Sequence, residues 1–246
     1  MLFRLRMQTT KLLGAGLGIA VAMALIPLSA PAQPAPPPYP QAPPYPQAPP
    51  PYSGQPPAYY PEQLDNLVGR IALYPDPLLA QILTASTYPD QIQPAAGWAN
   101  EHRYLTGDTL SRAIYDDRLP WDSSVLALIP FPAVLDMMAR DMGWTSQLGN
   151  AFMAQQQDVM DAVQRERHKA YDYGYLRTGP QVVVTPGPYI TIAPVNPGFY
   201  YVPMYDPLIV YAPPRPGFFV GGAIRFGGGI TIGAAFAPWG WGFARL

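Results

Sequence analysis

Hydrophobic residues recur at helical spacing from residue 62 to about residue 176. The first such stretch covers residues 64–71, and Tyr74-Pro75 ends it because the residue before a proline disfavours helical backbone. Later stretches follow Tyr-Pro-Asp, Thr-Gly-Asp and Pro-Trp-Asp tripeptides, and AVLDMMARDM at 133–142 continues the pattern. The pattern therefore predicts a mainly α-helical domain over residues 62–178.

Three residues are predicted to cap these helices: Asp76, Asp90 and Thr145. Asp76 precedes Pro77, and proline suits the first helical turn because an N–H has no partner there. Asp90 is followed three residues later by a glutamine, which is the spacing of a capping box. Thr145 is predicted to begin the longest helix, roughly residues 146–171, whose apolar residues fall mainly along one stripe.

After residue 179 the pattern changes to short β-branched and aromatic runs between proline, glycine and asparagine turns. The runs are QVVV, YITIAPV, FYYVPMY and LIVY. They predict a small antiparallel β meander over residues 179–213, with prolines at strand ends and edges. The fold class is therefore predicted to be α+β. The aromatic side chains predicted to form a binding surface are Tyr200, Tyr201, Tyr205 and Tyr211.

Residues 214–246 form a tail rich in glycine and aromatic residues, and two interpretations remain open. The spacing of Gly229 and Gly233 is typical of membrane helices that approach closely. Arg225 would be costly inside a bilayer, however, and AIRF and ITI around three glycines suit two short strands. We favour soluble or peripheral β structure, and keep membrane-associated assembly through this tail as the alternative.

Residues 1–32 have the features of a secretory signal peptide. Basic residues precede an apolar run at 12–30, and the small-x-small sequence Ala30-Pro31-Ala32 predicts cleavage before Gln33. An uncleaved membrane anchor is the alternative, because the run is close to the shortest length that spans a bilayer. Cleavage is favoured because a proline and small residues precede Gln33.

Residues 33–61 form a linker rich in proline and tyrosine. The hexad Tyr-Pro-Gln-Ala-Pro-Pro occurs at 39–44 and again at 45–50. Polyproline II has about three residues per turn, so the hexad places Tyr39 and Tyr45 on the same side. A stiff spacer without a packed core is the favoured interpretation, and a ligand for an aromatic-lined groove is the alternative.

The composition excludes several functions and kinds of site. The 34 prolines and 22 glycines are nearly a quarter of the 246 residues, which indicates long segments without a packed core. A charged fraction of 13% and a net charge of −1 argue against nucleic-acid binding. The absence of cysteine excludes disulfides and thiol chemistry. His102 and His168 stand apart, and no zinc, nucleotide or nucleophile motif is recognised, so no metal, cofactor or small-molecule substrate is predicted.

The tripeptide Tyr-Pro-Asp occurs twice, and its acids could form a catalytic pair or start two helices. Asp76 and Asp90 each follow a proline that ends the preceding element. An acid at a helix N-terminus satisfies free N–H groups and the helix dipole, and nothing in the sequence places the two acids across a substrate. We favour the structural role, and keep an envelope hydrolase that uses Asp76 or Asp90 as an alternative function.

Three stretches carry a resemblance to a known family. They are IALYPDPLLAQILTASTYP, the segment from FPAVLDMMARDM to DAVQRER, and APVNPGFYYVPMYDPLIVY. Together they resemble the exported bacterial proteins grouped as domain of unknown function 3300. The resemblance implies a protein of the periplasm or cell envelope of a Gram-negative bacterium and implies no reaction. We therefore expect a non-enzymatic binding or structural role, with envelope proteins or the membrane surface as partners.

Overall fold

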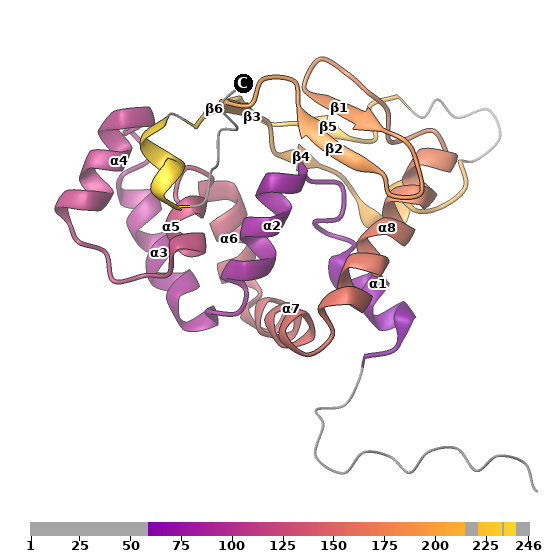
Figure 1. Ribbon diagram of the computed structural model, residues 1–246, viewed down its shortest axis with the longest axis horizontal. Coiled ribbons are helices and arrows are strands. Elements are labelled where there is room, and N and C mark those ends of the chain that lie inside the picture. Colours follow the sequence, from indigo (N-terminus) through magenta and orange to yellow (C-terminus); the bar gives the residue numbers. More distant parts are fainter. Residues whose placement is uncertain (1–58, 215–220, 233, 240–246) are drawn as a thin grey trace, which may run out of the picture. The chain divides into compact units, whose positions relative to one another are not determined.

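The computed structural model describes residues 59–214, 221–232 and 234–239, all within the compact unit Tyr52–Leu246. Its helices are α1 (Pro61–Val68), α2 (Asp76–Ala85), α3 (Pro89–Glu101), α4 (Gly107–Asp116), α5 (Ser123–Leu128), α6 (Pro132–Arg140), α7 (Met142–Ala154), α8 (Gln156–Asp172), α9 (Pro207–Val210) and the 3₁₀-helix η1 (Ala234–Trp239). Its strands are β1 (Val182–Thr185), β2 (Thr191–Pro194), β3 (Phe199–Tyr200), β4 (Pro203–Met204), β5 (Arg225–Phe226) and β6 (Ile230–Thr231). The predicted fold class is confirmed: the described chain is mostly helical, with short antiparallel strands in small sheets (Figure 1).

Prolines set where many of the helices begin. A proline occupies the first or second position of α1, α2, α3, α6 and α9. The fixed φ of proline suits the first turn, where its missing N–H would have no helical partner. This punctuation makes the helix starts in the first half of the chain visible from the sequence.

The predicted long helix at 146–171 is wrong, because two helices occupy this region (Figure 1). Gln155 separates α7 from α8 and has non-helical backbone, with φ −141° and ψ 50°. Its side chain accepts a hydrogen bond from the backbone N–H of Tyr59 at 2.7 Å and donates to the Tyr59 carbonyl at 3.4 Å. The break therefore coincides with a contact to the start of the described chain.

Two hydrophobic clusters hold the described elements together. The larger lies among α1 to α8 and also contains Tyr200, Val202, Ile232 and Phe236 from the later part of the chain. The ring of Tyr200 packs edge-to-face against Phe131, with centroids 6.1 Å apart. The smaller cluster joins the end of α8 to the β1–β2 hairpin and α9. Residues after 179 therefore complete the helical core.

The predicted meander is confirmed only for its first two strands. β1 and β2 form an antiparallel pair in which Val182 is opposite Pro194 and Thr185 is opposite Thr191. The FYYVPMY run instead splits into β3 and β4, which pair with β6 and β5 from the glycine-rich segment. The LIVY run begins inside α9, where the Asp206 carboxylate accepts a hydrogen bond from the Leu208 N–H at 2.9 Å and caps the helix.

Some predictions fall on residues outside the described part of the chain. These are the signal peptide at 1–32, the linker up to residue 58, and residues 215–220, 233 and 240–246 of the tail. Within the described ranges of the tail, AIRF and ITI do contain short strands, β5 and β6. No helix in these ranges is both long enough and apolar enough to cross a bilayer.

Candidate functional site

An apolar cavity of about 390 Å³ lies where the glycine-rich segment packs on the helices, and we call it the glycine cleft. Four segments contribute to its lining: 99–110, 129–133, 202–204 and 227–231. They comprise the end of α3 and start of α4, the α5–α6 junction, the chain around β4, and the turn between β5 and β6. The cleft has the size and mainly apolar lining of a small-molecule site.

Glycines give the cleft its open wall. Gly227, Gly228 and Gly229 all line it, so this wall has no side chains to fill the space. The Gly227 N–H donates to the carbonyl oxygen of Val202 at 3.1 Å, which ties the turn to the chain beside β4. A Cβ on Gly229 would run into the ring of Phe199, whereas one on Gly228 would meet open space. The wall is therefore held by the backbone and by one aromatic contact.

Polar groups of the cleft are concentrated after the end of α3. The ring of His102 stacks on Trp98, with centroids 3.9 Å apart and planes 17° apart. Its Nδ1 lies 2.9 Å from the Trp98 carbonyl oxygen. Since a carbonyl only accepts, this contact requires a hydrogen on Nδ1. The neighbouring Arg103 donates from Nε to the Asn100 carbonyl at 3.1 Å. Among the described residues that line the cleft there is one arginine and no carboxylate.

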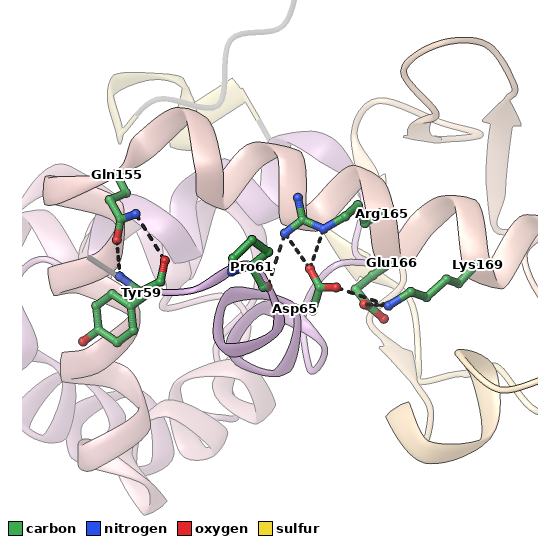
Figure 2. Close-up of polar contacts among 7 residues, drawn as sticks. All are labelled: Tyr59, Pro61, Asp65, Gln155, Arg165, Glu166 and Lys169. Atoms are coloured by element: carbon green, nitrogen blue, oxygen red, sulfur yellow. Dashed lines mark hydrogen bonds and ion pairs between the residues drawn. The ribbon is translucent and has the colours of Figure 1, made fainter. Parts of the chain in front are cut away.

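A second polar feature is a charged cluster between α1 and α8 (Figure 2). Lys169 Nζ lies 2.6 Å from a carboxylate oxygen of Glu166 and 3.2 Å from one of Asp65. Arg165 pairs with Asp65 at 2.7 Å and also donates to the Pro61 carbonyl at 3.3 Å. Burial raises the pKa of Glu166, and the hydrogen bond and charge of Lys169 oppose that shift.

The cluster has the geometry of an ion-pair network that fastens α1 to α8. Lys169 lies between the two carboxylates and donates a hydrogen bond to each. Burial alone would lower the pKa of Lys169, but its bonds to Glu166 and then Asp65 outweigh burial and raise it. The lysine therefore stays charged between its partners. A hollow of about 360 Å³ lies beside this cluster.

The two repeated acids are not brought together. Asp76 is the first residue of α2, and Asp90 lies in the first turn of α3. All of α2 separates them, a helix of ten residues and about 15 Å. Asp76 pairs with the buried Arg167 at 2.6 Å and accepts from the Ile192 N–H at 3.3 Å. This arrangement gives no paired carboxylates across a common substrate.

The predicted capping residues need correction. The cap positions of α2 and α3 are Pro75 and Tyr88, one and two residues before the two acids. Thr145 lies inside α7, where its hydroxyl donates to the Met138 carbonyl at 2.8 Å. The cap of α7 is Asp141, whose carboxylate accepts from the Trp144 N–H at 3.0 Å. The prediction failed because Thr145 was assigned to the start of one long helix.

The four predicted tyrosines do not form one exposed surface. Tyr200 is buried against the helices, and burial raises its pKa to about 12. The Tyr205 hydroxyl accepts from the Leu73 N–H at 3.3 Å, and the Tyr211 hydroxyl donates to the Gly69 carbonyl at 2.8 Å. Tyr201 is half-buried and packs edge-to-face on Phe199. These rings therefore join segments of the fold.

The glycine cleft was not predicted from the sequence. The first and last of its four segments are more than a hundred residues apart in the chain, and no local motif marks the four as one site. The one available signal was the run of three glycines between AIRF and ITI, which marked a turn. In the described residues, no group of three or more histidine or acidic side chains is arranged to hold a metal ion.

Comparison with known proteins identifies the family. The model of the family described as "Protein of unknown function (DUF3300)" matches residues 60–215. The chain belongs to this family. "Uncharacterized protein YacH" of Escherichia coli (strain K12) is 37% identical over 187 residues, which cover 63% of this chain and 30% of that protein. The chain thus spans less than a third of the length of this relative. No solved structure matches.

The DUF3300 match confirms the predicted resemblance, and it covers three of the four segments that line the cleft. The segments 99–110, 129–133 and 202–204 lie within the matched residues 60–215. The glycine wall at 227–231 lies after them. The cleft of this DUF3300 chain is therefore completed by residues that the family model does not match.

Proposed function

We propose that this protein is an exported binding module of the cell envelope, and that the glycine cleft holds a small apolar ligand. The observation that carries the proposal is the cleft itself, about 390 Å³ with a mainly apolar lining and a few polar groups on one side. Sites for small ligands have this form, with apolar walls for affinity and few polar groups for orientation.

Export is supported by the N-terminal sequence. The basic start, the apolar run at 12–30 and the Ala30-Pro31-Ala32 site together are typical of a signal peptide. The proline-rich linker would then hold the binding module away from whatever the N-terminus contacts. Envelope proteins or the membrane surface are the proposed partners of the exported chain.

A binding role agrees better with the cleft than catalysis does. The described lining residues include one histidine and no carboxylate, so they form neither a carboxylate pair nor an acid–histidine pair. General acid–base chemistry needs a proton donor or acceptor aimed at the reacting atom, usually held by a second group. The proposed role is therefore non-enzymatic.

Ala133 offers a way to test binding. It is exposed on α6 and lines the cleft, so a larger side chain there should fill the cavity without disturbing the core. Ala80 is equally exposed, on α2, and lies outside the lining. We expect the neutral fluorophore N-phenyl-1-naphthylamine to bind the mature protein saturably. Ala133→Phe should weaken this binding at least tenfold, and Ala80→Phe should leave it unchanged.

Equal binding by the two variants, with unaltered circular dichroism and melting temperature, would contradict the proposed site. Absence of saturable binding by the wild-type protein would contradict an apolar ligand altogether. If Ala133→Phe lowers the melting temperature, Ala133→Leu would replace it, because leucine adds less volume at the same position.

Cell fractionation tests export separately. The proposal predicts a chain that begins at Gln33 and leaves the cell with the periplasmic fraction. Retention in the cytoplasm with the N-terminal residues intact would contradict export. Retention that only detergent reverses would favour membrane-associated assembly through the tail or an uncleaved anchor.

A further inference from the structure

The charge of the cleft points to the chemistry of its ligand. Resting on the proposed function, we propose that the glycine cleft binds a single-chain anionic amphiphile, a medium-length alkyl carboxylate, with its apolar chain inside and its carboxylate beside Arg103. Three features of the cleft favour such a ligand: the size of the cavity, the positive charge at its polar side, and the absence of acids from the described lining.

The cavity has room for an alkyl chain of moderate length. A water molecule has about 30 Å³ of liquid volume, and a methylene group is of similar size, so 390 Å³ accommodates roughly ten such groups. The walls that would contact them include Leu105, Leu110, Ile129, Val202 and Ile230. Each methylene transferred from water contributes about 0.8 kcal/mol, so a chain of this length gains most of its affinity here.

The polar side of the cleft is positive. Arg103 is exposed and is the charged residue among the described lining residues. Its Nε donates to the Asn100 carbonyl, which ties the guanidinium to the backbone at the end of α3. Arginine binds carboxylates through planar paired N–H groups, and such charge-assisted bonds are stronger than neutral ones.

No acidic side chain among the described lining residues opposes the charge of Arg103. Asp136 accepts from Asn100 at 2.8 Å and lies 3.9 Å from Arg140. Asp117 accepts from the Trp98 indole N–H at 2.8 Å. Glu101 and Asp108 lie in the segment 99–110, but both are exposed and neither lines the cleft. Helix α6 also begins with a residue of the lining, Pro132, and has no acid in its first turn, so its N-terminus adds partial positive charge.

Displacement of the bound fluorophore by probes of equal chain length shows how the charge of the head group affects binding. The probes are decanoate, decan-1-ol and decylammonium, which share a chain length and differ in the charge of the head group. We expect decanoate to displace N-phenyl-1-naphthylamine at a concentration about threefold to tenfold lower than decan-1-ol, as expected for one exposed charge-assisted contact. Decylammonium should be the weakest of the three.

Variants then assign the preference to Arg103. Arg103→Gln should bring decanoate to the level of decan-1-ol, and Arg103→Lys should retain part of the difference. Arg112→Gln is the matched control, because Arg112 is exposed on α4 and lies outside the lining. This control should bind all three probes like the wild-type protein.

The outcomes distinguish this inference from the proposed function. If the fluorophore binds and Ala133→Phe blocks it, but decanoate and decan-1-ol displace it equally, the amphiphile proposal is overturned and the apolar site stands. If Arg103→Gln and Arg112→Gln weaken decanoate equally, the contact is a general charge effect and the proposal is also overturned. If no apolar probe binds the wild-type protein, both proposals fail.

Discussion

The guanidinium of Arg167 on α8 is buried and pairs with the carboxylate of Asp76, the first residue of α2, at 2.6 Å. The same guanidinium donates to the carbonyl oxygens of Ala72, Tyr74 and Ile190 at 2.8, 3.0 and 2.8 Å. One side chain thus joins α8, the α1–α2 connection and the start of the β1–β2 hairpin's second strand. A buried arginine with four partners is a structural centre of the fold.

Replacement of Asp76 by asparagine should therefore destabilise the protein. The buried guanidinium would lose its charge partner, and we expect a loss of about 2 kcal/mol, below the range for fully buried pairs because Asp76 is partly exposed. Asp90→Asn is the matched control and should change stability by less than about 0.5 kcal/mol. Urea unfolding at neutral pH measures both. Equal stabilities would show that the Arg167 pair contributes nothing, and loss of a cellular activity by both variants without loss of stability would favour the hydrolase alternative.

Gly149 allows α7 to approach the end of α2. A Cβ at this position would run into the carbonyl oxygen of Ser86 and lie 2.6 Å from its carbonyl carbon. Because the obstacle is backbone, Gly149→Ala should cost about 3 kcal/mol, the upper part of the range for overpacking. Gly97→Ala, on an open face of α3, should instead gain about 0.5–1 kcal/mol from helix propensity. Thermal unfolding should separate them, and a neutral Gly149→Ala would contradict the close approach.

The glycine wall gives a second matched pair. Gly229→Ala should push the Phe199 ring aside and cost about 1 kcal/mol, since the obstacle is a side chain that can move. Gly228→Ala meets open space and should change stability by less than about 0.5 kcal/mol. Aromatic NMR signals of Phe199 should shift in the first variant alone. Identical spectra for the two variants would contradict the contact between Phe199 and the turn.

Lowering the pH should reduce the stability of the folded protein, partly through protonation of Asp141. Its pKa is lowered by the hydrogen bond from the Trp144 N–H and then by Arg70, 2.9 Å away. A carboxyl with a lowered folded pKa contributes stability above its unfolded value of about 3.9, and that contribution is lost as pH falls through the folded pKa. Asp141→Asn keeps an N-cap and removes the titration, so its stability should fall less steeply between about pH 5 and 2. Urea midpoints across this range measure the slope, and parallel curves would contradict the role of Asp141.

Local sequence signals predicted the helices well because each start carries its own punctuation. Pro77, Pro89 and Pro132 lie in first turns, and these positions are determined by residues adjacent in the chain. The break at Gln155 was missed because no proline or glycine marks it. It depends on Tyr59, 96 residues away, which satisfies the glutamine side chain.

The sheets and the cleft could not be predicted from local sequence signals, because they too depend on contacts between residues far apart in the chain. β3 and β4 have two residues each, too few to show a periodic pattern, and their partners lie beyond residue 220. The tyrosines of this region were predicted to form a binding surface, yet Tyr200 packs on Phe131. The glycine cleft combines four segments, and long-range packing alone brings Arg103 and Gly228 into one lining.

A methyl-NMR titration of the mature protein with N-phenyl-1-naphthylamine would show whether the glycine cleft binds an apolar ligand. An aromatic ligand in the glycine cleft should shift the methyl signals of Ile129, Ala133, Met204 and Ile230, which line it. Leu208 and Ile209, which are exposed on α9 outside the cleft, should not move. Shifts confined to α9, or no saturable shift in the cleft methyls, would contradict an apolar binding site there.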